Sequence, residues 1–410
     1  MSAPNILSTP ACIIGGGPAG LLAAELLSKQ GIKVHLFDAM PSVGRKFLLA
    51  GIGGMNITHS EEMPVFAQRY QPAGVLDAFL PLFDNQKIQS WVRSLGLETF
   101  TGSSGRIFPT DMKAAPLLRA WLRRLREQGV EIHTRSRFQG WNEQGQLLIE
   151  KNAQPILVNA KTTLLALGGA SWPRLGSDGG WVKLLSQHNI HIAPLQPSNC
   201  GFLVEQWSPH FISKYAGAPV KSCAISLTNQ TFRKGEFVVT KDGVEGSLVY
   251  ALSYSIRQQL NSTGKATIYI DLQPQRTLEQ VIQKLQRPRA SQSFSKFIHN
   301  QLKLDGVRAG LLRELVPNCQ SLTPIELAKA IKSTPLALIA TRPIDEAIST
   351  DGGICFSELT EQLMLKKIPS VFCAGEMLNW DAPTGGYLLT GCFATAAACA
   401  QGMLNYLAKA

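Results

Sequence analysis

The sequence predicts an α/β fold, and three observations support this prediction. An apolar strand, a glycine-rich turn and an Ala/Leu-rich helix follow one another near the start of the chain. A second apolar strand and a small-residue helix lie near its end, and short alternating strands followed by helices lie between. We therefore expect one α/β domain built from both chain ends, with further structure inserted between them.

The first of these regions, ACIIGGGPAGLLAAELLSKQGIKVHLFD, contains the motif Gly15-x-Gly17-x-x-Gly20. A strand precedes the motif, a helix follows it, and a second strand ends at Asp38. In this context Gly15 permits the tight turn, Gly17 lets the backbone approach a pyrophosphate, and Gly20 lets helix and strand pack closely. Asp38 is placed to accept hydrogen bonds from ribose hydroxyls. The pattern predicts a Rossmann-like dinucleotide site.

The late strand, IPSVFCAGE, ends in Gly375-Glu376 and precedes the helix GCFATAAACAQGMLNYL. In flavoproteins with this N-terminal motif, such an acid meets the ribityl or pyrophosphate region. The positive end of the following helix stabilises negative charge on the reduced flavin. The strand LLAL, ending at Gly168-Gly169, is a further landmark in the expected order. The order favours FAD as the bound cofactor.

Two sequence motifs are absent, and their absence narrows the class of flavoprotein. No second GxGxxG occurs, so a dedicated NAD(P)H domain is not expected, although NAD(P)H could reduce the flavin by docking transiently. The first helix region also lacks the CxxxxC pair of disulfide reductases, which excludes that class.

Six segments occur in the order typical of one flavoprotein family: IIGGGPAGLLAA, GRKFLLAGIGGMNITHS, GRIFPTDMKAAPLLRAW, LLALGGASWPRLGSDGGW, STDGGI and AGEMLNWDAPTGGYLLTGC. The sequence resembles the BaiN/RdsA-type family of FAD-dependent flavoproteins along nearly its whole length. The resemblance implies an FAD-binding domain interrupted by a β-rich domain and a small helical subdomain. We place the FAD-binding domain at 1–190 and 340–410, the β-rich domain at 191–275 and the helical subdomain at 276–339.

The segment VGRKFLLAGIGGMNITHS carries four glycines and the basic pair Arg45-Lys46, which make it an anion-friendly loop. The resemblance implies that this loop packs along FAD, with Arg45 and Lys46 near the phosphates or the flavin rim. The complete predicted cofactor set is Gly15, Gly17, Pro18, Ala19, Gly20, Asp38, Arg45, Lys46, Gly53, Asn56, Gly168, Gly169, Gly375, Glu376, Gly385, Gly386 and Tyr387.

The chain departs from the family where many members carry Gly-Arg-Cys-Asn-x-Thr-Asn. Here the arginine and cysteine are absent, Met55 has no transferable proton, and His59 stands at the final asparagine. Candidate proton donors are His59, Tyr387 and Cys392, and only His59 has an unperturbed pKa near neutrality. The chain is therefore a divergent branch of the family, and its substrate does not transfer directly from the resemblance.

The formal net charge is +11 and the isoelectric point about 9.3. Residues 213–338 hold 17 Lys or Arg and 8 Asp or Glu, a net charge of +9. This balance suits RNA or another anionic substrate, or simply a basic surface that keeps the protein soluble.

Family members reduce carbon–carbon double bonds, some making dihydrouridine in ribosomal RNA, and amine-oxidising relatives also occur. We favour a reductase acting on RNA or another anion. The alternatives are a small-molecule oxidase and a flavin-loaded RNA-binding or assembly protein.

The remaining features concern location and metals. The eight cysteines are scattered, and neither a signal peptide nor an 18-residue apolar run occurs. The seven histidines are dispersed without metal-ligand spacing. We expect a cytoplasmic protein with no membrane association and no metal, and the sequence leaves its oligomeric state open.

Overall fold

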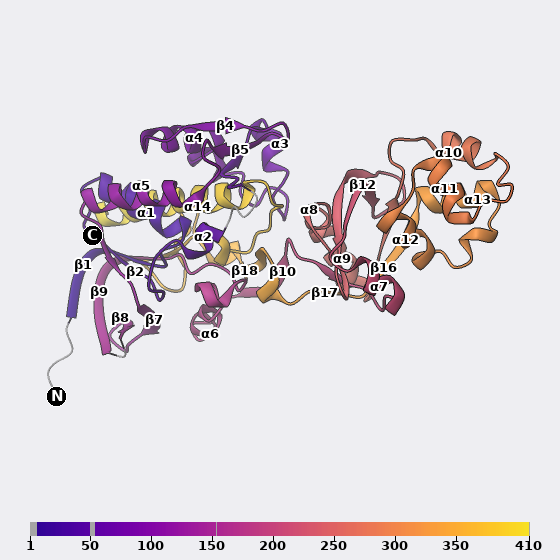
Figure 1. The fold of residues 1–410 in the computed structure, drawn as a ribbon. Coiled ribbons are helices and arrows are strands. Elements are labelled where there is room, and N and C mark those ends of the chain that lie inside the picture. The colour runs from indigo at the N-terminus through magenta and orange to yellow at the C-terminus, as the bar shows by residue number, and fades with distance from the viewer. Residues whose placement is uncertain (1–5, 50–53, 153, 410) are drawn as a thin grey trace. The chain divides into compact units, whose positions relative to one another are not determined.

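The computed structural model describes residues 6–49, 54–152 and 154–409 (Figure 1). The chain forms two compact units, one of residues 1–197 and 348–410 and the other of residues 198–347. The predicted inserted region, 191–339, therefore differs from the observed second unit by several residues at each border. The reason is that β10 (Ile192–Ser198) and β18 (Ser349–Ile354) pair in a two-stranded sheet where the chain leaves and re-enters the first unit.

The first unit is built on a sheet with the strand order β6-β2-β1-β9, and β19 also pairs with β9. These strands are mutually parallel: β1 (Ile6–Ile14), β2 (Val34–Phe37), β6 (Glu131–His133), β9 (Gln154–Leu165) and β19 (Val371–Cys373). The antiparallel strands β7 (Ser136–Trp141) and β8 (Leu147–Lys151) extend the sheet along the first half of β9. Open parallel sheets of this order bind ligands at the carboxyl ends of their strands.

Small residues let two helices pack closely in this unit. The helices α1 (Pro18–Lys29) and α14 (Tyr387–Lys409) bury mainly Ala, Gly, Leu and Thr side chains. Within the described residues, α14 is the one helix long and apolar enough to span a membrane by length and composition, but 67% of its apolar window is buried. Such burial is that of a core helix.

The other elements of the first unit surround this core. They are α2 (Arg45–Leu49), β3 (Thr58–His59), α3 (Met63–Ala67), α4 (Asn85–Ser94), β4 (Thr99–Thr101), β5 (Arg106–Pro109), α5 (Ala114–Glu127) and α6 (Trp181–Ser186). β3, β5 and β4 form a three-stranded antiparallel sheet.

The second unit contains a seven-stranded antiparallel sheet of order β16-β15-β12-β13-β14-β11-β17. Its strands are β11 (Phe202–Leu203), β12 (Pro219–Ser226), β13 (Arg233–Val239), β14 (Gly243–Glu245), β15 (Ala266–Asp271), β16 (Thr334–Leu338) and β17 (Ala340–Thr341). Its helices are α7 (Pro209–Tyr215), α8 (Ser247–Tyr250), α9 (Ser253–Thr263), α10 (Leu278–Leu285), α11 (Phe294–Leu302), α12 (Gly306–Leu315) and α13 (Pro324–Lys332).

The helices α10–α13 connect β15 to β16, which are neighbours in this sheet. The segment 276–339 is thus an excursion from the β-rich part, and its last residues return to the sheet as β16. The two parts share one hydrophobic core, to which Ile268, Leu285 and Leu336 all belong.

Candidate functional site

A cavity of about 590 Å³ opens in the first unit beside the carboxyl ends of β1, β2, β9 and β19. The described residues of its wall all belong to this unit and come from both ends of the chain. The predicted site residues that line it are Gly15, Gly17, Pro18, Ala19, Asp38, Arg45, Lys46, Gly168, Gly375, Glu376 and Cys392. The structure therefore brings together the turn, the strand ends and the basic loop that the sequence indicated.

The three fingerprint glycines occupy different surroundings. A Cβ on Gly15 would lie 2.2 Å from the Ala166 carbonyl oxygen, and one on Gly20 would lie 1.9 Å from the carbonyl oxygen of Gly15. A Cβ on Gly17 would meet nothing within 4 Å, and Gly17 has φ −80°. Gly15 and Gly20 are thus required by the turn and by packing, whereas Gly17 leaves space on the cavity side for a ligand.

The Asp38 carboxylate is held at the end of β2 by backbone groups. Its Oδ2 accepts a hydrogen bond from Gly16 N at 2.7 Å, and its Oδ1 accepts one from Met40 N, also at 2.7 Å. Burial raises the pKa of Asp38, and these two N–H groups partly oppose that rise. A carboxylate has about four acceptor positions, so Asp38 retains capacity for ribose hydroxyls.

Glu376 and Lys46 form an ion pair in the cavity wall. Lys46 Nζ lies 2.9 Å from Glu376 Oε1 and 2.6 Å from Oε2, and it also donates to Ser171 Oγ at 2.8 Å. The amide of Thr350 donates to Glu376 Oε1 at 2.9 Å. The family resemblance predicts Lys46 near the cofactor, and the late strand predicts the same for Glu376; the structure shows that the two residues form an ion pair.

Some buried polar atoms of this region lack a hydrogen-bond partner among the described residues: Arg45 Nε, Asn56 Oδ1 and Ser177 Oγ. Arg45 and Ser177 line the cavity. An unsatisfied buried polar group costs about 1–3 kcal/mol, so a ligand rich in phosphate and hydroxyl groups would offset that cost. Together with the open space at Gly17, the atoms of Arg45 and Ser177 fit an FAD.

Other predicted residues lie outside this cavity's wall. Tyr387 begins α14, is 5% exposed, and donates its hydroxyl to Glu61 Oε2 at 2.8 Å. Arg69 Nε donates to the same oxygen at 3.0 Å. The hydrogen bond from Arg69 is the main cause of the lowered pKa of Glu61, while burial and the neighbouring carboxylate raise the pKa of Tyr387. The tyrosine thus anchors the start of α14 to an ion pair.

Gly385 and Gly386 precede this tyrosine, and they too are absent from the cavity's wall. A Cβ on Gly386 would lie 2.4 Å from Thr58 Cα, so the two backbones meet there. The predicted residue Gly53 lies outside the described residues.

His59 is engaged at both ring nitrogens. Glu61 N donates to Nδ1 at 3.2 Å, which places the ring proton on Nε2, 3.0 Å from the Ser104 carbonyl oxygen. Its ring stacks on Tyr387 with centroids 5.3 Å apart. The third candidate, Cys392, lies in the cavity wall, and burial raises the pKa of its thiol to about 12.

Several residues that shape this site were not predicted from the sequence. Thr350 and Ser177 lie inside the segments STDGGI and LGSDGGW, so closer attention to their hydroxyls could have found them. Thr350 Oγ1 accepts from the amides of Ala170 and Ser171 at 2.9 and 3.1 Å. No local pattern pointed to the pairing of Glu61 with Arg69.

A parallel sheet with this strand order, a glycine turn open to a cavity and a late acid in the same wall define an FAD-dependent oxidoreductase. The chain belongs to the family described as HI0933-like protein Rossmann domain, whose model matches residues 9–402. This family membership implies FAD, which the turn at Gly17, Asp38 and the Lys46 region would hold.

Two curated relatives extend along nearly the whole chain. A Haemophilus influenzae protein named ribosomal RNA dihydrouridine synthase is 24% identical over 400 residues, covering 95% of this chain and 96% of the relative. An Escherichia coli K12 protein of the same name is also 24% identical, covering 96% and 98%.

Two solved structures are similar to this chain in fold. A flavocytochrome c3 fumarate reductase superposes with a TM-score of 0.51 at 14% identity, covering 99% of this chain and 79% of that one. A 3-ketosteroid Δ1-dehydrogenase from Sterolibacterium denitrificans gives 0.52 at 12% identity, covering 98% and 100%.

Proposed function

We propose that this protein is an FAD-dependent reductase that converts uridine to dihydrouridine in ribosomal RNA, with NAD(P)H as electron donor. The observation that carries the proposal is the pair of relatives named for this activity, aligned along almost the entire chain. Because the sequence has no second dinucleotide motif, NAD(P)H would reduce the flavin by docking transiently on its face.

The charge of the second unit supports an RNA substrate. Exposed cations on it include Lys214, Lys221, Arg233, Lys234, Lys241, Lys265, Arg287, Arg289, Lys296, Lys303 and Lys329. Two acids of this unit are engaged within it: Asp271 pairs with Lys332 at 2.5 Å, and Glu314 accepts from Ser208 N at 2.6 Å. The unit therefore retains an excess of positive charge for phosphate contacts.

Reduction of an activated C=C bond needs a hydride at one carbon and a proton at the other. Bound FAD, once reduced, supplies the hydride. Loss of the Tyr387 proton would place a phenolate beside the Glu61 carboxylate, so Tyr387 is a poor acid. Cys392 is a poor acid because the pKa of its buried thiol lies far above neutrality. His59 remains the preferred proton donor: as an imidazolium it would give up one ring proton and return to the neutral form, in which Nδ1 accepts from Glu61 N.

Substitution of His59 tests whether this residue acts as a proton donor or only holds the local structure. Asparagine, the residue many family members carry there, can still accept the Glu61 N–H bond but cannot act as an acid. We expect His59→Asn and His59→Ala both to retain FAD and to slow reoxidation of the reduced flavin by RNA roughly a hundredfold. Stopped-flow absorbance of the flavin measures this rate. A His59→Asn protein with the wild-type rate would assign His59 a purely structural role.

The proposed activity itself is tested by mass spectrometry of ribosomal RNA nucleosides from cells with and without the gene. We expect one dihydrouridine to disappear on deletion and to return when the wild-type gene, but not a flavin-free variant, is supplied. An unchanged nucleoside profile would contradict the proposal and favour a small-molecule substrate.

A further inference from the structure

A second cluster of ligand-type side chains lies away from the cavity described above. His35 on β2 and Glu131 and His133 on β6 project from one face of the sheet, because side chains two residues apart share a face and the strands pair His35 with Glu131. His35 is 1% exposed, whereas the Glu131 side chain is 47% exposed, so the cluster reaches solvent at the sheet edge. We propose that these three residues bind a divalent transition-metal ion, with Zn²⁺ as the reference ion.

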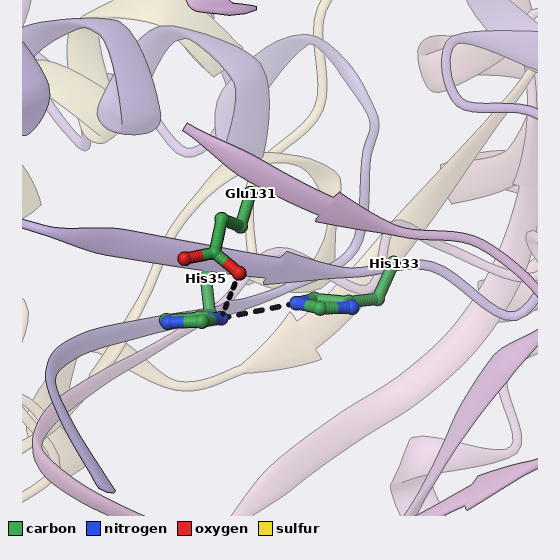
Figure 2. A group of neighbouring side chains, drawn as sticks. All are labelled: His35, Glu131 and His133. Carbon is green, nitrogen blue, oxygen red and sulfur yellow. Dashed lines mark hydrogen bonds and ion pairs between the residues drawn. The ribbon is translucent and has the colours of Figure 1, made fainter. Parts of the chain in front are cut away.

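The distances bring three ligand atoms together. His35 Nδ1 lies 3.0 Å from His133 Nε2 and 3.5 Å from Glu131 Oε2, and all three atoms lie within 4.8 Å of one another (Figure 2). Two imidazoles and a carboxylate form a donor set that zinc and other first-row metals accept.

The hydrogen bonding leaves the cluster incomplete without a further ligand. The two facing histidine nitrogens can share only one proton, and Glu131 Oε2 lies on the same side of the pair. Lys33 Nζ pairs with the other oxygen, Glu131 Oε1, at 3.0 Å, which leaves Oε2 directed to the cluster. A divalent cation in place of the shared proton would be bound by all three atoms, His35 Nδ1, His133 Nε2 and Glu131 Oε2.

The observed rings set a condition on binding. Figure 2 shows the two rings side by side, with one nitrogen of each facing the other. Their centroids lie 5.3 Å apart and their planes differ by 8°. A metal needs lone pairs that converge on one point, so the ligands must shift on binding, and this movement falls mainly to His133 and Glu131 because His35 is only 1% exposed. The half-exposed His133 and the exposed Glu131 have room for that movement.

A metal here would tie β6 to β2 next to the nucleotide cavity. The residue after β2 is Asp38, whose amide donates to the His133 carbonyl oxygen at 2.8 Å. The ion would thus stabilise the strand end that carries the ribose-binding acid, which makes it structural and independent of the substrate.

The test uses full-length protein stripped with a chelator and titrated with Zn²⁺ against a chromophoric indicator. We expect one Zn²⁺ per chain, binding at least tenfold weaker in His133→Gln and Glu131→Gln, and unchanged binding in His210→Gln, which alters an exposed histidine of the second unit. Zn²⁺ should raise the melting temperature of the wild type but not of His133→Gln. Bound Co²⁺ should show no thiolate charge-transfer band.

Equal affinity in the wild type and Glu131→Gln would overturn the proposal, and so would a thiolate band, which would assign the metal to cysteines. Because Glu131 is exposed, its glutamine variant tests the site even where His133→Gln fails to fold.

Discussion

Gly17→Val should yield a folded but colourless protein. At this position the backbone has a φ that valine adopts readily, and a Cβ placed there has no atom within 4 Å beyond the neighbouring residues of the chain. It would instead fill the space at the start of α1 where the backbone approaches the pyrophosphate. Wild-type protein should be yellow and release FAD on heating, whereas Gly17→Val should retain almost none after gel filtration, as absorbance and chromatography of the released flavin will show.

Two further substitutions serve as controls for this result. Lys29→Val places the same side chain on the exposed end of α1 and should leave flavin occupancy unchanged. Gly20→Val, whose Cβ would collide with the Gly15 carbonyl oxygen, should damage the fold itself. Full flavin occupancy in Gly17→Val, or release of FMN from the wild type, would show that the turn does not carry the pyrophosphate of FAD.

RNA binding should weaken steeply as salt increases. A surface that neutralises about six phosphates loses on the order of a thousandfold in affinity between about 50 and 200 mM salt, because counterions are released on binding. Reversal of Lys284, Arg287 and Arg289 to glutamate should weaken binding further and reduce the salt dependence, with the flavin spectrum unchanged. These residues end α10 and begin the segment before α11, and within the described part of the chain they form no ion pair. Fluorescence anisotropy with a ribosomal RNA fragment measures both effects.

A control with the same change in charge is available on α5, where Arg119, Arg123 and Arg126 are exposed. Their reversal changes the net charge equally but on the FAD-binding unit. We expect a smaller loss of affinity there. An equal loss in both triple variants would indicate attraction by net charge alone, and salt-independent binding would contradict a phosphate-binding surface.

The sequence by itself determined the class of this protein, because the chemistry of a dinucleotide turn is local. Gly15, Gly17 and Gly20 act within one strand–turn–helix unit, so their spacing is legible without a structure. The Gly375-Glu376 strand and the family segments are equally local. Their order along the chain was sufficient to predict an FAD-binding domain made from both chain ends, and the family match confirms that class.

Only the tertiary structure decided which of these residues touch. The ion pair of Lys46 with Glu376 joins residues 330 positions apart, and the anchoring of Tyr387 by Glu61 joins residues 326 apart. The His35–Glu131–His133 cluster arises from strand pairing across the sheet, so the spacing of histidines in the sequence indicated no such site. The unit borders at 198 and 347 likewise depend on the pairing of β10 with β18. Each of these contacts depends on where distant strands meet, which residue patterns along one segment do not encode.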